Sequence, residues 1–271
     1  MAGRNAEKRI PGRVEVDLGM SGKGRTTLRL DKALTHLGYG SRSDIKKYVK
    51  QGLITVNGNR AKDSGMHIHP ETDVILLDGE RVHYREHIYV MLHKPPGVVS
   101  ATEDNRDRTV LDLLPPEYLA FEPFPVGRLD KDTEGLLLLT NDGKLAHELL
   151  SPRRHVPKTY TAWVLGEVGE ADVKRFAEGV TLDDGYVTLP GELVVLGHDR
   201  QGEEVVSRIE LTIHEGKFHQ VKRMFQSVGK KVTYLKRIRM GGLILDPSLQ
   251  LGEYRELTED ELALLSGVKV E

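Results

Sequence analysis

The chain has 271 residues, 38% of them hydrophobic, with no cysteine and a formal net charge of −2. This length allows one large domain or two ordinary ones, and the lack of cysteine excludes a disulfide scaffold, a thiolate zinc site and a cysteine nucleophile. The longest leucine run, Leu136 to Leu139, is far shorter than the roughly 20 apolar residues of a membrane-spanning helix. Residues 1–26 contain no apolar stretch typical of a secretory signal. We therefore expect a cytoplasmic protein with no membrane partner.

Basic residues are concentrated at the N-terminal end of the chain. Residues 1–60 contain 13 Lys and Arg and 5 Asp and Glu, a net charge of +8, whereas the remaining residues contain 26 and 36, a net charge of −10. Such asymmetry is typical of a protein with one end that meets a polyanion, although a solubilising basic tail is the alternative. Residues 1–26 have no sustained periodicity and are expected to form a disordered basic arm.

Residues 27–85 are expected to form a small module. Apolar residues recur at helical spacing from Leu30 to Leu37. Ser41 is a suitable N-cap for a second helix, which spans residues 42–51. The dipeptide Asn57-Gly58 predicts a hairpin turn between short strands. A module of this size is marginal alone but adequate as a docked domain.

Residues 86–271 are expected to form a second, larger domain. Segments rich in Val, Thr and Tyr predominate, and helical patterns lie between them. This pattern predicts an α+β fold with a mixed, largely antiparallel sheet. The expected strands span residues 88–92, 98–100, 125–129, 136–140, 158–165, 186–195, 205–213 and 231–240. The expected helices span residues 110–114, 144–150, 170–178, 218–228 and 259–265.

In the most informative segment, GRLDKDTEGLLLLTNDG at residues 127–143, a loop with three carboxylates and two cations precedes an apolar run. Charged groups between buried strands are costly unless they are paired or used in chemistry. Loops held by rigid strands often carry catalytic groups. An ordinary hairpin with a solvated acidic turn is the alternative interpretation.

Four segments in chain order resemble motifs of the pseudouridine synthases of the RsuA type. The segment at residues 127–143 resembles the family signature, in which the Asp of G-R-L-D is catalytic and corresponds to Asp130. HKPPG at residues 93–97, SPRRHVPKTY at 151–160 and EGKFHQVKRM at 215–224 resemble three further family motifs. The order and number of these motifs make the resemblance far more specific than one short pattern.

The N-terminal module resembles the alpha-L (S4-like) RNA-binding domain that RsuA-type enzymes carry at the same end. LRLDK at residues 28–32 and the stretch from Ser41 to Gly58 carry this resemblance. Cations on two short helices suit RNA phosphates, although a solvated charged helix pair is the alternative. The cations expected to bind RNA are Arg29, Lys32, Arg42, Lys46, Lys47 and Lys50.

The resemblance implies the isomerisation of uridine to pseudouridine within RNA, with no cofactor and no metal. Asp130 would act on an extruded nucleotide, as a nucleophile on the sugar or as a base. Its ionisation requires a nearby cation, for which Lys222 is the expected residue and Arg223 the alternative. Tyr160 corresponds to the active-site Tyr of the family, and Arg128 is expected to bind the flipped nucleotide or its phosphate.

The HQVKRM motif is most similar to that of the small-subunit branch of the family. We therefore expect a monomer that modifies small-subunit ribosomal RNA, within a ribosomal subunit or an assembly intermediate. Two alternatives stay open: a large-subunit synthase of the same branch, and a noncatalytic RNA-binding protein of ribosome assembly. A glycoside hydrolase that uses Asp130 and Glu134 is disfavoured, because their spacing on one loop is poor evidence for the carboxylate separation that such enzymes need.

Overall fold

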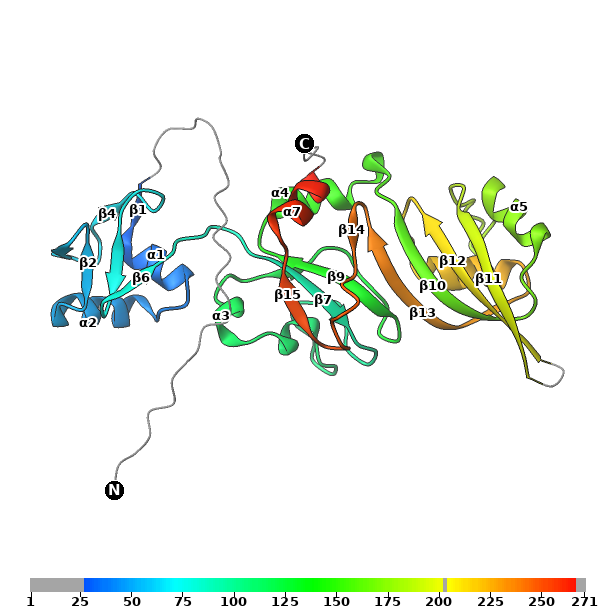
Figure 1. Ribbon diagram of the computed structural model, residues 1–271, viewed down its shortest axis with the longest axis horizontal. Helices are drawn as coiled ribbons and strands as arrows, with labels where there is room; N and C mark the ends of the chain where they lie inside the picture. The colour runs from blue at the N-terminus through cyan, green and yellow to red at the C-terminus, as the bar shows by residue number, and fades with distance from the viewer. Residues whose placement is uncertain (1–26, 202–203, 267–271) are drawn as a thin grey trace, which may run out of the picture.

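The computed structural model describes residues 27–201 and 204–266, so the expected basic arm at residues 1–26 lies outside the described residues. A small module lies at one end of an elongated molecule, and a larger body of helices and strands makes up the rest (Figure 1). In the described part of the chain, no helix is long and apolar enough to cross a membrane.

The small module packs two helices against short antiparallel strands. Its strand order is β3-β2-β5-β6, and β1 pairs separately with β4. Leu30, Leu34, Ile45 and Ile54 are fully buried in its core. The module contains β1 (Leu28–Arg29), α1 (Leu30–His36), α2 (Arg42–Gln51), β2 (Ile54–Val56), β3 (Asn59–Arg60), β4 (His67–Ile68), β5 (Ile75–Leu77) and β6 (Glu80–Val82).

The turn chemistry of the module confirms the predictions made from its sequence. The Ser41 hydroxyl caps α2 by accepting a hydrogen bond from the Asp44 amide at 3.3 Å. Gly52 ends this helix in the left-handed conformation, with φ at 72°. Asn57 and Gly58 both have positive φ, the backbone that a type I′ hairpin turn requires. The predicted boundary after residue 85 falls in the segment between β6 and the first strand of the body.

The body is built on a mixed, largely antiparallel sheet with the strand order β11-β12-β10-β13-β9-β7-β15. β8 pairs with β9, and β14 pairs with β13. The strands are β7 (Tyr89–Lys94), β8 (Phe124–Pro125), β9 (Glu134–Thr140), β10 (Lys158–Leu165), β11 (Glu192–Gln201), β12 (Glu204–Ile213), β13 (Lys231–Met240), β14 (Leu243–Ile244) and β15 (Tyr254–Glu256). The helices are η1 (Val110–Leu113), α3 (Pro116–Leu119), α4 (Gly143–Leu150), η2 (Pro152–Arg154), α5 (Glu170–Glu178), α6 (Gln220–Ser227) and α7 (Glu259–Ser266).

The leucine run of β9 is continuous because both faces of this strand are buried. Leu137 and Leu139 pack in the main core, which also includes residues of β10, β12, α5 and α6. Leu136 and Leu138 pack in a second core with residues of α4 and α7. A strand covered on both faces loses the usual alternation of apolar and polar residues, so β9 is a rigid support for the loop that precedes it.

Several predicted elements of the body are wrong in extent or type, and for four of them backbone geometry gives the reason. Residues 98–100 form no strand, only an isolated bridge from Val99 to Thr109. β8 ends at Pro125, because Gly127 has a φ of 81° and turns the chain away. β11 begins at Glu192 rather than 186, after Pro190, which has no amide hydrogen to donate to a ladder. The helix expected from residue 218 begins at Gln220, since His219 is left-handed with a φ of 49°.

The helix expected at residues 110–114 is a short 3₁₀ helix, η1. The other expected helices of the body agree with α4, α5 and α7 to within one residue at each end, and two expected strands match β10 and β13. Among the elements not predicted from the sequence are β1, β4, β14, β15, α3 and η2, which are too short for a periodic pattern.

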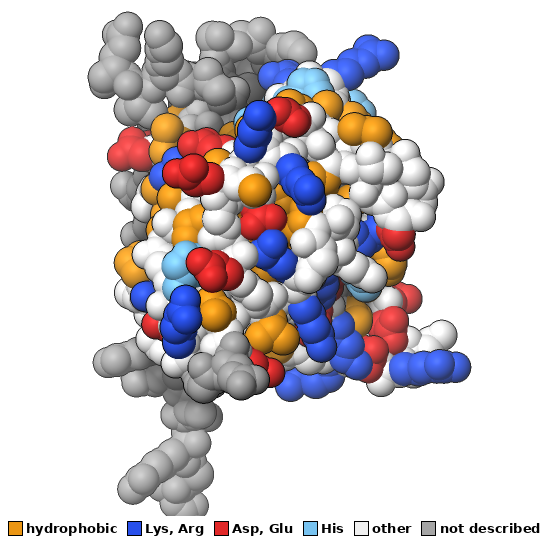
Figure 2. Space-filling model, turned by 90° about the vertical axis from the view of Figure 1, so that its right-hand side faces the viewer, with side chains coloured by type: hydrophobic (Ala, Val, Ile, Leu, Met, Phe, Trp, Pro, Cys, Tyr) orange, Lys and Arg blue, Asp and Glu red, His pale blue; other side chains and the backbone are white. Residues whose placement is uncertain are grey.

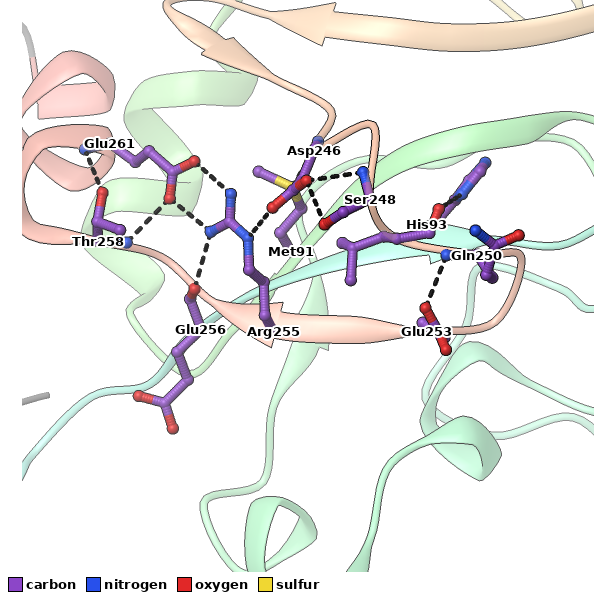
Figure 3. Close-up of polar contacts among 11 residues, drawn as sticks. Met91, His93, Asp246, Ser248, Gln250, Glu253, Arg255, Glu256, Thr258 and Glu261 are labelled. Carbon is purple, nitrogen blue, oxygen red and sulfur yellow. Dashed lines mark hydrogen bonds and ion pairs between the residues drawn. The ribbon is translucent and has the colours of Figure 1, made fainter. Parts of the chain in front are cut away.

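Arg255 on β15 links this strand to α7 and to the loop after β14 (Figure 3). Arg255 donates to both carboxylate oxygens of Glu261 at 2.7 Å and to Asp246 at 2.6 Å. Hydrogen bonds from Ser248 and Arg255 lower the pKa of Asp246 to about 2. The loop after Asp246 also reaches β7, where the His93 ring bonds to the Leu249 carbonyl at 2.8 Å.

The module and the body touch through a small aromatic contact. The His36 ring lies edge-on to Phe121, with ring centroids 4.8 Å apart, and its Nε2 bonds to the Glu86 carbonyl at 3.0 Å. The Arg85 guanidinium lies over the Phe121 ring at 4.9 Å and pairs with Glu256 at 2.6 Å. The helix α1 therefore contacts the body beside α3.

Gly135 provides a test of how closely β9 and β13 must approach. Its φ is 110°, and a Cβ here would overlap the backbone carbonyl oxygen of Arg237 on β13. We expect Gly135→Ala to lower the free energy of unfolding by roughly 2 kcal/mol or more, because strained backbone alone costs about 1–3 kcal/mol. Chemical denaturation of the full chain measures this change.

The matched control is Gly143→Ala at the start of α4, where an added Cβ meets nothing within 4 Å and φ is not positive. This control is expected to be neutral or slightly stabilising. Equal stability of the two variants would contradict the steric role assigned to Gly135.

Candidate active site

Asp130 lies on the loop that leads into β9, and a buried lysine organises that loop. The Lys94 side chain on β7 has no solvent exposure. Its ammonium donates to the carbonyls of Pro95 and Asp130 at 3.0 Å and of Thr133 at 2.9 Å. Burial lowers the pKa of Lys94 to about 8, and the nearby carboxylates oppose this shift. The loop backbone thus wraps around one cation, and the Asp130 side chain is left 25% exposed.

The helix α6 places a second cation against this loop. Val221, Met224 and Phe225 are buried at helical spacing, so the neighbouring position 222 faces the loop. Lys222 Nζ lies 2.9 Å from Asp130 Oδ2 and 2.6 Å from Asp132 Oδ1. The structure thus brings together Asp130 and Lys222, two residues singled out from the sequence.

Lys222 and Asp132 stabilise each other in their charged forms. Partial burial lowers the pKa of Lys222, but its hydrogen bonds to Asp132 and Asp130 outweigh that effect and raise it. Desolvation alone would raise the pKa of Asp132, but the hydrogen bond and the charge of Lys222 outweigh it, so this pKa is lowered. Lys222 is therefore charged at neutral pH, as a partner of an ionised carboxylate should be.

A third side chain approaches Asp130 from the start of α6. His219 Nε2 lies 3.5 Å from Asp130 Oδ1. His219 was weighed as a hydrogen-bonding residue from the sequence but not included among the expected site residues, although its position inside the HQVKRM motif pointed to it. Lys94 was also missed as a site residue, although a lysine that ends the apolar run of β7 was a visible anomaly.

Arg223 does not contact the candidate site carboxylate. Its guanidinium pairs with Asp183, and with Asp184 at 2.7 Å. The alternative in which Arg223 is the partner of Asp130 is therefore wrong in this structure. The geometric reason is that consecutive helix residues point about 100° apart, so Lys222 and Arg223 cannot face the same loop.

Tyr160 lies in the sheet beside the site without touching Asp130. It is buried on β10 and pairs in register with Arg237 of β13, which in turn pairs with Gly135 at the start of β9. This places Tyr160 two strand spacings, about 10 Å, from the end of the loop. Among the described residues, no hydrogen bond or ring contact joins it to Asp130. Arg128 is exposed on the same loop.

The basic residues of the module form a separate feature. Arg42, Lys46 and Lys50 recur every four residues along α2 and are exposed, so they share one face of the helix. Arg29 is exposed but pairs with Asp31 at 2.7 Å, and Lys47 pairs with Asp44 at 3.1 Å. Arg42, Lys46 and Lys50 thus form a basic face of α2 and make no ion pair with another described residue.

The basic face of α2 begins at the junction with the body. A pocket of about 410 Å³ lies there, lined from the module by residues that include Lys32 and Arg42 and from the body by Phe121 and Asn141. At the opposite end of the molecule, basic and acidic side chains are interspersed (Figure 2). Within residues 27–201 and 204–266, no group of three His, Asp or Glu side chains is placed to hold a metal ion.

Two family models match the chain. Residues 88–227 match RNA pseudouridylate synthase, and residues 28–75 match the S4 domain. An uncharacterized RNA pseudouridine synthase, YtzG, of Bacillus subtilis (strain 168) is 54% identical over 239 residues, which cover 88% of this chain and 98% of the relative. A solved structure described as a pseudouridylate synthase is 37% identical, covers 88% of this chain and 99% of its own, and superposes with a TM-score of 0.60.

Relatives with named ribosomal targets fall in two groups. A ribosomal small subunit pseudouridine synthase A of Vibrio vulnificus is 39% identical over 87% of this chain and 98% of the relative. A ribosomal large subunit pseudouridine synthase B of Bacillus subtilis is 38% identical over 88% of this chain and 95% of the relative. The sequence identities alone do not show whether this chain is more similar to the small-subunit or to the large-subunit synthases.

Lys94 can be tested as the organising residue of the Asp130 loop. We expect Lys94→Met to lower the free energy of unfolding by about 3 kcal/mol, because several buried carbonyls lose their donor at once. The control is Lys131→Met, which removes an exposed cation whose ion pair, to Asp107 at 2.6 Å, lies at the surface. Such a pair contributes at most about 1 kcal/mol. Denaturant unfolding of both variants makes the comparison, and a Lys94→Met variant as stable as the control would refute it.

Proposed function

The chain belongs to the RNA pseudouridylate synthase family and carries an S4 domain, and on this premise we propose that it isomerises a specific uridine of small-subunit ribosomal RNA, with Asp130 as the catalytic residue. One observation carries the catalytic assignment. Asp130 is the partly exposed carboxylate that two separate cations hold in place, Lys94 through the loop backbone and Lys222 through the side chain. Asp132 also forms an ion pair with Lys222, but its side chain is 74% exposed, so its carboxylate is largely solvated.

The reaction keeps every atom of the uridine. The bond from the sugar C1′ to the uracil N1 breaks, the base rotates, and a bond from C1′ to C5 replaces it. The proton leaves C5, and N1 ends with a proton. Asp130 serves this exchange as a nucleophile at C1′ or as a base that removes a sugar proton. In either role it must be ionised, which the Lys222 ammonium at 2.9 Å supports.

The uridine must leave the RNA stack before Asp130 can reach its sugar. Tyr160 is proposed to lie against the extruded uracil and to assist the removal of the C5 proton, a role that rests on the resemblance of residues 151–160 to the family motif. Arg128 is exposed on the Asp130 loop, where a guanidinium can bind the phosphate of the flipped nucleotide.

The small-subunit target is supported by the relatives of that name and by the motif at His219 to Met224. Five relatives between 37% and 39% identity are small-subunit synthases. A ribosomal subunit or an assembly intermediate in the cytoplasm is the proposed setting, with the protein acting as a monomer. The large-subunit synthase at 38% identity makes large-subunit RNA the second candidate.

The catalytic assignment predicts that Asp130→Asn lowers pseudouridine formation by roughly 10³-fold or more while RNA binding stays near normal. Asn keeps the shape of the side chain and removes the charge that the chemistry uses. The control is Asp132→Asn, which removes the other carboxylate bound by Lys222 and is expected to keep most of the activity. Purified variants would be compared on small-subunit particles from cells that lack the enzyme. Appreciable turnover by Asp130→Asn would contradict the assignment.

The same cells, which lack the enzyme, also serve to identify the target RNA. Pseudouridine mapping across their ribosomal RNA should show one missing site in the small subunit, restored by the parent chain and not by Asp130→Asn. A missing site in the large subunit would replace the proposed target with the second candidate. An unchanged map of both RNAs would favour a noncatalytic role in ribosome assembly.

The basic face of α2 predicts a separable contribution to RNA binding. The triple variant R42Q/K46Q/K50Q should make the slope of log affinity against log salt shallower by about 0.7–0.9 for each phosphate that is no longer neutralised. The single-turnover rate at saturating enzyme should change little, since the candidate catalytic residues all follow residue 88. The control is K174Q/R175Q/K231Q, which removes exposed cations at the end far from the module. A large rate loss at saturation with an unchanged slope would show that the module acts in the chemical step instead.

A further inference from the structure

Phe218 is an exposed aromatic residue next to the candidate active site. Its side chain is 76% exposed, more than any other large hydrophobic side chain of the described residues. The ring stacks on His219, with centroids 3.7 Å apart and planes 20° from parallel. His219 in turn lies 3.5 Å from Asp130. The exposed ring is therefore one residue away from a side chain that approaches the candidate catalytic carboxylate.

The backbone that carries Phe218 is held on both sides. The Lys217 amide donates to the Gln220 side chain at 2.8 Å, and the side-chain amide of Gln220 donates to Glu215 at 2.9 Å. The Phe218 carbonyl accepts a bond from Arg223 at 3.3 Å, and the left-handed His219 turns the chain into α6. These bonds hold the backbone at Phe218, and the stack on His219 orients the ring while leaving it exposed, which lowers the entropy lost when a ligand stacks on it.

The surroundings of Phe218 suit an RNA strand rather than an apolar partner. Lys217 directly precedes Phe218, and its ammonium lies over the Tyr186 ring at 4.3 Å. Lys222, the third residue of α6, is held by Asp130 and Asp132. Cations beside an exposed aromatic ring are the arrangement by which proteins bind single-stranded nucleic acid, with the ring stacked on a base and the cations near phosphates. An RNA with one base extruded offers such a base, because its neighbours lose a stacking partner.

We propose that Phe218 stacks on a nucleobase that flanks the uridine undergoing isomerisation and so holds the RNA in its opened form. The inference rests on the proposed function, because it takes the RNA at Asp130 as the substrate. Phe218 is a positioning residue in this role, and the stack of Phe218 on His219 sets the distance between the flanking base and Asp130.

The first experiment measures binding and turnover for Phe218→Ala, Phe218→Trp and the parent. Loss of one base–aromatic stack corresponds to roughly a 5- to 150-fold loss of affinity, so Phe218→Ala should weaken binding to protein-free ribosomal RNA within this range. Phe218→Trp keeps a stacking surface and should stay close to the parent. The control is Leu196→Ala, which truncates an exposed apolar side chain on β11, an edge strand separated from β9 by β12, β10 and β13. It should leave affinity unchanged.

The second experiment reports stacking directly. Trp163 is the single tryptophan of the chain, so the double variant W163F/F218W carries one fluorophore at position 218. Binding of protein-free RNA should quench its fluorescence, whereas the same RNA should quench the parent far less.

The outcomes separate this inference from the proposed function. Parental affinity and turnover in Phe218→Ala would overturn the stacking role and leave the catalytic assignment intact. Weak binding that Phe218→Trp does not rescue, with no quenching, would assign Phe218 to local packing and also overturn it. An effect seen only on ribosomal particles would overturn it in favour of an interaction with a ribosomal protein. Quenching by an RNA in which the parent forms no pseudouridine would support stacking while the proposed function fails.

Discussion

The ion pair between Asp130 and Lys222 joins two parts of the chain that are far apart in sequence. Each residue is useful only because its own support is rigid. Asp130 stands on a loop closed around the buried Lys94 ammonium, and Lys222 stands on a helix anchored by Val221, Met224 and Phe225. An ionised carboxylate in a partly desolvated place is unstable without such a cation. The surrounding strands and helices can be understood as the means of holding this one pair at 2.9 Å.

The sheet supplies the rigidity on the Asp130 side. β9 is buried on both faces, by the main core and by the core beneath α4 and α7, so the loop that precedes it has a fixed base. The Arg255 network fastens β15 and α7 over the same region, and the His93 bond ties the C-terminal loop to β7 (Figure 3). Lys94, the Asp130 loop with β9, and Lys222 lie in three separate family motifs, and together they set the position of one carboxylate.

Local patterns in the sequence predicted much of this fold, and long-range packing accounts for the remainder. The Ser41 cap, the Asn57-Gly58 turn and the strands β10 and β13 follow from short-range chemistry and were predicted correctly. The start of α6 depends on a left-handed His219, a conformation unusual for a residue with a side chain and invisible to a periodicity argument. In the site, motif resemblance located Asp130 and Lys222. The contacts of Lys94 could not be predicted, because they depend on which carbonyls the folded loop turns inward.

The pairing of β13 with β9 has a mechanical consequence. These two strands run parallel and pair at Glu134 and Gly135, whereas β10 pairs with both of its neighbours along its whole length. The body thus has a narrow seam, with β9, β7 and β15 on one side and β13, β10, β12 and β11 on the other. Asp130 belongs to the first side, and Lys222, on a helix packed against β13, belongs to the second. The ion pair therefore crosses this seam beside the hydrogen bond from Tyr234 to Glu134 at 2.9 Å, so a change in the spacing of β9 and β13 would act directly on the distance between Asp130 and Lys222.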